Sequence, residues 1–203
     1  MATTEDIIAN PPPADTLFDA QSTFGKNGPF ELEIGCGKGG FILRRALDNP
    51  DLRLLGIEWA NKYFKFAADR MARRGALNVR IMRTDARDFV IQHLPPGCLS
   101  ALHIYHPDPW PKKRHHRRRL FQKDFIAAAI RSLIPGARWA IQTDHAEYFE
   151  WISELMEQAK GIERTEYDDP EFGIVEASAQ TNFEIKYREE GRTIYSLAYR
   201  KLT

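Results

Sequence analysis

The chain has 203 residues with 29 Lys plus Arg against 28 Asp plus Glu, so its net charge at pH 7 is only +1. This balance excludes a generally basic protein that coats nucleic acid without specificity. A hydrophobic content of 43% suffices for one well-buried core. No run approaches the roughly 20 apolar residues of a membrane span, so we expect no membrane segment.

Residues 1–29 predict a short flexible leader, because they contain early acids, a run of three prolines and no apolar stretch typical of a signal peptide. We expect residues 30–203 to form one domain. Cys36 and Cys98 are too few for a thiolate metal cage, and we expect both to be reduced in a cytoplasmic protein.

From residue 30 onward, short apolar runs alternate with amphipathic ones, which is typical of strands crossing to helices in a parallel sheet. The pattern predicts strands over 30–34, 52–57, 79–83, 101–105, 138–143, 162–167 and 194–199. It predicts helices over 39–48, 61–74, 118–133 and 146–160. The expected fold class is therefore α/β, with a mostly parallel seven-stranded sheet and helices on both faces.

The first predicted strand ends in a glycine-rich turn, Gly35-Cys36-Gly37-Lys38-Gly39-Gly40. Glycines let the chain turn tightly from strand into helix and bring bare backbone N–H groups against a ligand. Gly35, Gly37 and Gly40 also satisfy the dinucleotide fingerprint, so this turn alone does not separate nicotinamide cofactors from S-adenosylmethionine (SAM).

Acids at the ends of three consecutive predicted strands favour SAM. Glu33 stands two places before the first glycine, where SAM-dependent methyltransferases carry an acid facing the cofactor's amino-acid end. Glu58 closes the second strand and is placed to accept from two ribose hydroxyls, a feature that NAD enzymes share. Asp85 and Ala86 close the third strand, where a carboxylate can accept from the adenine amino group and an apolar neighbour can flank the ring.

The segment Pro107–Arg119 joins a lone carboxylate, Asp108, to six Lys or Arg within residues 112–119. Asp108 follows the predicted strand 101–105, so it should project from the carboxyl edge of the sheet, where open α/β sheets bind ligands. Trp110 is either a stacking platform for a base or a core residue. The cationic run is typical of polyanion binding, and the whole segment predicts an enzyme that acts on nucleic acid.

Together these motifs resemble those of the bacterial tRNA (guanine-N7-)-methyltransferase family. The matching motifs are Glu33-Ile34-Gly35-Cys36-Gly37-Lys38-Gly39, Ile57-Glu58, Asp85-Ala86, Pro107-Asp108-Pro109-Trp110-Pro111-Lys112-Lys113-Arg114-His115-His116, Thr143-Asp144 and Thr181-Asn182-Phe183-Glu184. The resemblance runs from about residue 30 to the C-terminus and implies a Rossmann-like SAM-dependent fold. It implies methylation of N7 of the guanosine at position 46 in the variable loop of tRNA. Gly40 departs from the commoner pattern, which has an acid there.

The resemblance also implies roles for individual residues. The acids that match SAM contacts are Glu33, Glu58, Asp85 and Asp108, and Gly35, Gly37 and Ala86 complete the expected cofactor site. Asp108 also matches the active-site residue. The residues that match substrate contacts are Lys112, Asp144, Thr181, Asn182, Phe183 and Glu184. The residues that match the RNA-binding region are Arg114, Arg117, Arg118 and Arg119.

The chemistry agrees with these residue types, because guanine N7 bears a lone pair and no proton, and its methylation needs no general base. Catalysis would then depend on alignment and electrostatics, with Asp108 stabilising positive charge as it develops on the purine. No acid–histidine spacing predicts a metal site. We expect tRNA as the partner, no obligatory protein partner, and a monomer or homodimer.

Two alternatives stay open. One is methylation of another RNA nucleophile such as an exocyclic amine, because Asp108-Pro109-Trp110 distantly resembles the Asn/Asp-Pro-Pro-aromatic turn of amino methyltransferases. The other is a non-catalytic RNA-binding module, against which the intact glycine turn and the strand-end acids argue.

Overall fold

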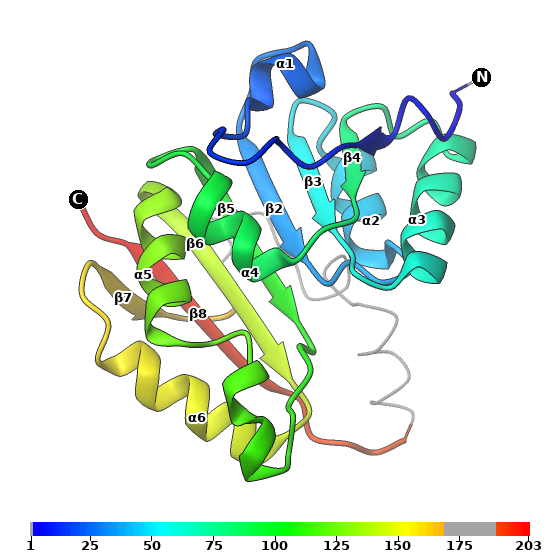
Figure 1. Cartoon of the computed structure of the whole chain (residues 1–203). Coiled ribbons are helices and arrows are strands. Elements are labelled where there is room, and N and C mark those ends of the chain that lie inside the picture. Colours follow the sequence, from blue (N-terminus) through cyan, green and yellow to red (C-terminus); the bar gives the residue numbers. More distant parts are fainter. Residues whose placement is uncertain (1, 169–189) are drawn as a thin grey trace.

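The computed structural model describes residues 2–168 and 190–203. Within these residues one sheet has the strand order β1-β4-β3-β2-β5-β6-β8-β7 (Figure 1). The strands are β1 (Ile8–Ala9), β2 (Phe30–Ile34), β3 (Arg53–Ile57), β4 (Val79–Met82), β5 (Leu99–Tyr105), β6 (Leu133–Thr143), β7 (Ile162–Thr165) and β8 (Tyr195–Lys201). Neighbouring strands from β1 to β6 pair in parallel, whereas β8 is antiparallel to both β6 and β7.

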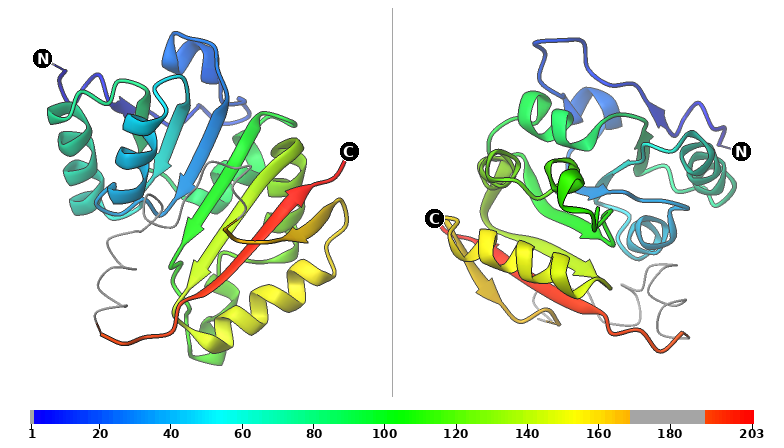
Figure 2. Two further views of the ribbon diagram at one scale, coloured as in Figure 1. Left: turned by 180° about the vertical axis from the view of Figure 1, so that it is seen from behind. Right: turned by 60° about the horizontal axis from the view of Figure 1, so that its bottom comes forward.

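Helices pack on both faces of this sheet (Figures 1 and 2). They are α1 (Ala20–Phe24), α2 (Gly40–Asp48), α3 (Asn61–Arg73), α4 (Ala86–Asp88), α5 (Lys123–Ser132) and α6 (Ala146–Glu157), with a π-helical turn at Phe89–His93 and a 3₁₀ turn at Lys113–Arg118. Side chains of α2 and α3 share a core with β3 and β4 on one face. Side chains of the π-helical turn, α5 and α6 share the larger core on the other face.

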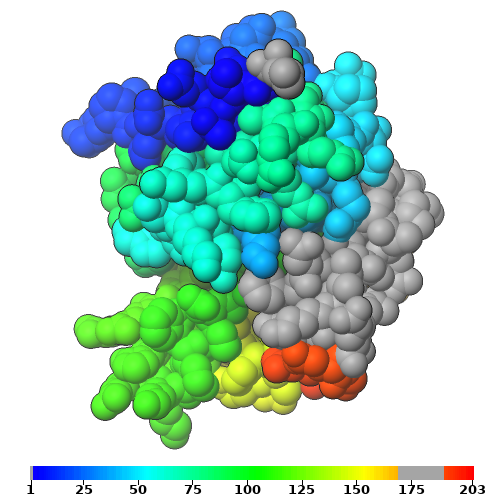
Figure 3. Space-filling view, turned by 90° about the vertical axis from the view of Figure 1, so that its right-hand side faces the viewer, coloured from blue at the N-terminus to red at the C-terminus, as the bar shows by residue number. Residues whose placement is uncertain are grey.

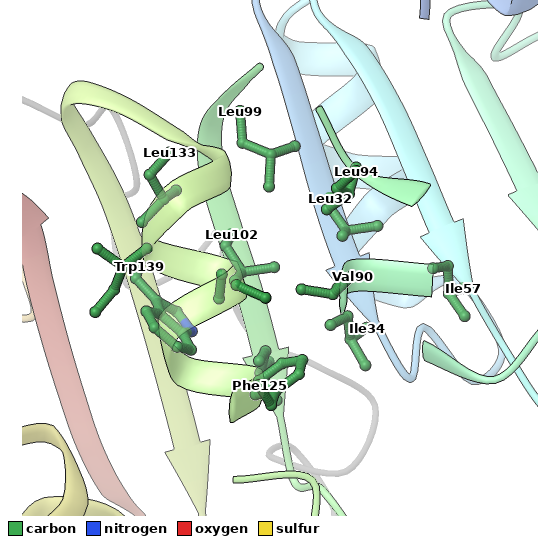
Figure 4. Close-up of a cluster of buried hydrophobic side chains, with 14 of the residues drawn as sticks. Leu32, Ile34, Ile57, Val90, Leu94, Leu99, Leu102, Phe125, Leu133 and Trp139 are labelled. Atoms are coloured by element: carbon green, nitrogen blue, oxygen red, sulfur yellow. The ribbon is translucent and has the colours of Figure 1, made fainter. Parts of the chain in front are cut away.

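The larger core forms because side chains alternate along each strand. Figure 4 shows Leu32 of β2 and Val90 of the π-helical turn in this core. Farther along, Phe125 of α5 meets Trp139 of β6 edge to face, with ring centroids 6.2 Å apart. Because Leu32 points into this core, its neighbours along β2 point to the opposite face, which α2 covers.

Every strand and helix predicted from residue 30 onward is present; β2 has the predicted bounds, and the ends of the others are shifted. The sheet has eight strands and not seven, because β1 pairs with β4 through Ile8 and Ile81. Residues 1–29 were expected to be a flexible leader, but Ile7 is fully buried and the Phe18 ring stacks on Phe30 at 5.6 Å. A two-residue strand is too short to show a period, so the sequence did not reveal it.

The predicted helix over residues 118–133 begins later than expected. The helix α5 starts at Lys123, and the preceding cationic residues form the 3₁₀ turn. In that turn the amide of His115 donates to the carbonyl of Lys112 at 2.7 Å.

Candidate active site

The carboxyl ends of β2, β3, β4 and β5 meet at an open pocket of about 400 Å³. This volume lies within the usual range for a small-molecule site. Of the residues singled out from the sequence, those that line the pocket are Gly35, Gly37, Glu58, Asp85, Ala86, Asp108, Trp110 and Arg118. The fold thus brings four separate segments to one place, as expected for the edge of a parallel sheet.

The glycine turn joins β2 to α2 through left-handed backbone. The φ angles of Gly35, Gly37 and Gly39 are +73°, +54° and +70°, which side chains rarely tolerate. A Cβ atom on Gly35 would meet nothing within 4 Å, so this glycine opens onto the pocket. A Cβ atom on Gly39 would lie 2.6 Å from Cε of Met71, so Gly39 permits close packing of the turn on α3.

Glu58 closes β3 at the pocket wall. Its Oε2 accepts from the amide of Gly37 at 2.9 Å, and its Oε1 accepts from the amide of Ala60 at 2.7 Å. These bonds hold the carboxylate beside the glycine turn, and each oxygen keeps a second lone pair for a hydroxyl donor.

Asp85 follows β4 and caps α4. Its Oδ1 accepts from the amides of Arg87 at 2.9 Å and Asp88 at 3.1 Å, which satisfies donors at the helix start. Both bonds use the same oxygen atom. Asp85 is exposed and lines the pocket together with Ala86.

Glu33 lies in β2, just before the glycine turn, and is not among the residues that line the pocket. Its side chain is buried, and Oε2 makes no hydrogen bond with the described residues. Burial raises the pKa of Glu33 to about 8, against opposing contributions from the backbone of Ile42 and the charge of Arg44. A buried acceptor without a donor costs free energy, so binding of a donor or cation that reached Glu33 would be favourable.

The sequence patterns did not predict a buried polar network next to the pocket. The hydroxyl of Tyr105, which lines the pocket, lies 3.1 Å from Nδ1 of His103, and Nε2 of His103 lies 3.1 Å from Oε2 of Glu31. Arg45 donates to both carboxylate oxygens of Glu31, at 3.0 and 2.7 Å. The network connects α2 through β2 and β5 to the side chain of Tyr105.

The protonation states in this network follow from burial and hydrogen bonding. Burial opposes ionisation of Glu31, but the hydrogen bonds from His103 and Arg45 outweigh it and lower the pKa of Glu31 to about 2. Burial also lowers the pKa of His103, so the ring is neutral at pH 7 and Arg45 carries the balancing charge. A neutral ring that donates from Nε2 to Glu31 accepts at Nδ1 from Tyr105.

Asp108 lies on the loop that follows β5. His106 and Trp110, on either side of it, have φ angles of +52° and +43°. Left-handed backbone is uncommon for such side chains and marks a locally constrained loop. Asp108 itself is exposed and lines the pocket. Trp110 is half-buried at the pocket, and the guanidinium of Arg118 lies 5.0 Å from its ring centroid.

The cationic segment, residues 112–119, separates into an exposed part and one buried residue. Lys112, Arg114, Arg117 and Arg118 are exposed, as RNA contacts require. Arg119 is fully buried, so the prediction that it binds RNA is wrong.

The chain turns inward at the end of the 3₁₀ turn. The guanidinium of Arg119 is therefore buried, and it serves a structural role. It donates to both carboxylate oxygens of Glu147, at 3.1 and 2.5 Å, and to the carbonyl of Pro109 at 2.9 Å. It also lies over the rings of Tyr148 and Trp151, 5.0 and 4.9 Å from their centroids. Arg119 therefore ties the loop that carries Asp108 to α6.

Of the remaining expected substrate residues, Asp144 is the one that the structure describes, and it is not among the residues that line the pocket. Asp144 follows β6, pairs with Arg192 at 3.0 Å, and has Oδ1 3.7 Å from Nδ1 of the pocket residue His106. Thr181, Asn182, Phe183 and Glu184 lie outside the described residues. Within the described part of the chain, no group of three or more His, Cys, Asp or Glu could hold a metal ion.

A mostly parallel sheet with a glycine turn after β2, and acids at the ends of the next two strands, fits the class of SAM-dependent methyltransferases. A family model described as a putative methyltransferase matches residues 27–197. A tRNA (guanine-N(7)-)-methyltransferase of Geobacter metallireducens is 37% identical over 195 residues, which cover 96% of this chain and 92% of that protein. One of Alkalilimnicola ehrlichii is 34% identical over 94% of this chain and 80% of its own. The chain belongs to the tRNA (guanine-N(7)-)-methyltransferase family.

Solved structures confirm the fold. The 16S rRNA methyltransferase KamB superposes with a TM-score of 0.63 at 14% identity, covering 92% of this chain and 95% of its own. TrmN of Thermus thermophilus superposes with a TM-score of 0.59 at 16% identity, covering 90% of this chain and 47% of its own. No helix in the described residues is long and apolar enough to cross a membrane.

Proposed function

We infer that this chain transfers a methyl group from SAM to N7 of a guanine in tRNA. The observation that carries this inference is the pocket, which joins the glycine turn, Glu58, Asp85 and Asp108 at one edge of the sheet. The exposed cations of residues 112–118 adjoin it through Arg118, in a chain of the tRNA (guanine-N(7)-)-methyltransferase family.

The residues at this edge fit the parts of SAM. The open space at Gly35 admits a ligand against the backbone, and the unsatisfied Oε2 of Glu33 suits a cationic amino group. Glu58 can accept from ribose hydroxyls with its remaining lone pairs. Asp85 can accept from an adenine amino group through Oδ2, while Ala86 offers an apolar contact to the ring.

When bound, SAM supplies an electrophilic methyl group on a positively charged sulfur. Guanine N7 has a lone pair and no proton, so none of this chain's residues needs to act as a base. The pocket residues align the two reactants, which can supply much of the rate enhancement. The carboxylate of Asp108, which lines the pocket, would stabilise positive charge as it develops on the purine.

We propose that the target is the guanosine at position 46 of the tRNA variable loop. Lys112, Arg114, Arg117 and Arg118 are exposed and suit contacts with the RNA, with Lys112 nearest the target nucleotide. Asp144 is proposed to recognise the guanine base together with Glu184 of the motif Thr181 to Glu184. The half-buried Trp110 at the pocket can offer its ring to the base.

We further propose that the enzyme acts in the cytoplasm without an obligatory protein partner, as a monomer or homodimer. A tRNA substrate supports this location, and Cys36 and Cys98 are free cysteines. Light scattering of the purified chain would test the oligomeric state.

Incubation with SAM and unmodified tRNA, followed by nucleoside analysis, tests the proposed function. The expected product is 7-methylguanosine. A methylated exocyclic amine would favour the alternative nucleophile, and binding of tRNA without any methylated product would favour the non-catalytic module.

A further inference from the structure

A second basic surface flanks the pocket on the side opposite the cationic segment. This α3 surface comprises exposed residues on α3 and the segments next to it, namely Lys38, Trp59, Lys62, Tyr63, Lys65, Phe66, Arg73, Arg74 and Arg83. Trp59, Tyr63 and Phe66 are 65%, 38% and 44% exposed, and they are the exposed aromatic side chains of the described residues. Large aromatic side chains gathered on a surface often mark a binding site.

The charge of this surface differs from that of the whole chain. Residues 59–74 contain five Lys or Arg and one acid, Asp69, whereas the full sequence is nearly balanced. Asp69 already pairs with Arg73 at 2.6 Å. Cations also lie over the aromatic rings, with Nζ of Lys38 6.0 Å from the Phe66 centroid and the Arg83 guanidinium 5.8 Å from the Trp59 centroid. Such a mixture of cations and aromatic faces suits a polyanion with stacking bases.

The α3 surface is continuous with the pocket. Trp59 and Tyr63 form part of the pocket lining, and so do Arg118 of the cationic segment and Trp110 just before that segment. Figure 3 shows the cyan and teal surface that includes α3 above the green surface around residues 110–120, with a hollow between them. A nucleotide in the pocket would therefore have positive charge on both sides.

We propose that the α3 surface is a second tRNA-binding surface, which holds the backbone on the far side of the target nucleotide and stacks an unpaired base on Phe66. This inference rests on the proposed function, since the surface adjoins the pocket in which the target nucleotide of tRNA would meet SAM. Lys62 and Lys65 contact phosphates, and the exposed ring of Phe66 provides the stacking face.

The test compares one variant of the α3 surface with a matched control. Lys62→Ala/Lys65→Ala removes two exposed lysines of the α3 surface, and Lys123→Ala/Lys160→Ala removes two exposed lysines from the groove between α5 and α6. The measurement is the affinity for unmodified tRNA over a range of KCl concentrations. The α3 variant should lower the log–log salt slope by about 0.7 to 0.9 for each lysine, and the control should leave the slope unchanged.

Phe66→Leu separates stacking from charge. It should weaken tRNA binding at least about fivefold without changing the salt slope, and Phe66→Tyr should restore the affinity. SAM affinity and the methylated atom should stay unchanged in all four variants.

An unchanged slope and full tRNA affinity in the Lys62→Ala/Lys65→Ala variant would overturn the proposal. The proposal would also be overturned if light scattering showed a dimer for the wild-type chain and a lower molecular mass for this variant, with unchanged tRNA affinity. A second copy of the chain, and not tRNA, would then cover this face. Because the readout is binding, the result is independent of product formation. A wild-type chain that binds tRNA through α3 but forms no 7-methylguanosine would contradict the proposed function alone.

Discussion

Asp108 is the residue on which the proposed chemistry depends most. Its backbone is held between two prolines, and the loop is anchored through the contact of Pro109 with Arg119. Its own side chain is exposed, so it contributes little to the core. A role in catalysis and a role in folding can therefore be separated at this position.

Asp108→Ala should leave the unfolding temperature unchanged and SAM affinity within a few-fold of wild type. The same change should lower kcat for tRNA methylation by about 100-fold or more. Asp108→Asn is the control, because it keeps the shape and removes the charge. If charge stabilisation is the role, both variants should lose activity. Near-normal turnover in either variant would remove Asp108 from the proposed role.

Glu33 predicts a pH dependence of SAM binding. Its pKa of about 8 means that the carboxyl group is mostly protonated at pH 7 in the free protein. A cationic ligand group would lower that pKa and release the proton, so SAM affinity should rise by up to about tenfold per pH unit from about pH 6 to 7.5. Calorimetry in buffers of different ionisation enthalpy would detect the released proton.

Glu33→Gln is the matching control and should bind SAM weakly with little pH dependence.

The raised pKa of Glu33 also has a consequence for the stability of the folded protein. The folded state binds the Glu33 proton more tightly than the unfolded state, so the stability of the free protein declines as pH rises from about 4.5 to about 8. The variant should lack that decline, and an equal pH dependence in both proteins would contradict this account of Glu33.

At the scale of elements, the cationic segment shows what sequence reasoning can and cannot reveal. Its charge predicted RNA contacts, and most of its arginines are exposed. The inward turn of Arg119 depends on Glu147 and two aromatic rings of α6, which are about 30 residues away in the chain. No local pattern distinguishes Arg119 from its exposed neighbours.

Arg117→Ala and Arg119→Ala should therefore differ in kind. Arg119→Ala removes a forked ion pair, a hydrogen bond and two ring contacts, so it should lower the free energy of unfolding by about 2 kcal/mol. Arg117→Ala should leave stability unchanged and lower the salt slope of tRNA binding by about 0.7 to 0.9. Denaturant unfolding and salt titration would show the difference, and equal effects of the two changes would contradict it.

At the scale of the whole molecule, periodicity predicted the strands and helices from residue 30 onward. It also predicted that Gly35, Glu58, Asp85 and Asp108 share a pocket, because parallel strands end at a common edge. It did not predict the Glu31 network, since strand register decides which side chains meet. In the fold His103 of β5 is in register with Glu33 of β2, and its ring bonds to Glu31 two residues earlier on that strand; this arrangement has no signature in either segment.

The pocket is proposed to direct a methyl group to guanine N7. Two tRNA transcripts that differ only at position 46, one with guanosine and one with 7-deazaguanosine, provide the most direct test. Labelled methyl from SAM should enter the first transcript as 7-methylguanosine and should not enter the second, which lacks the nucleophilic nitrogen. Equal labelling of both transcripts, or labelling of neither, would contradict it.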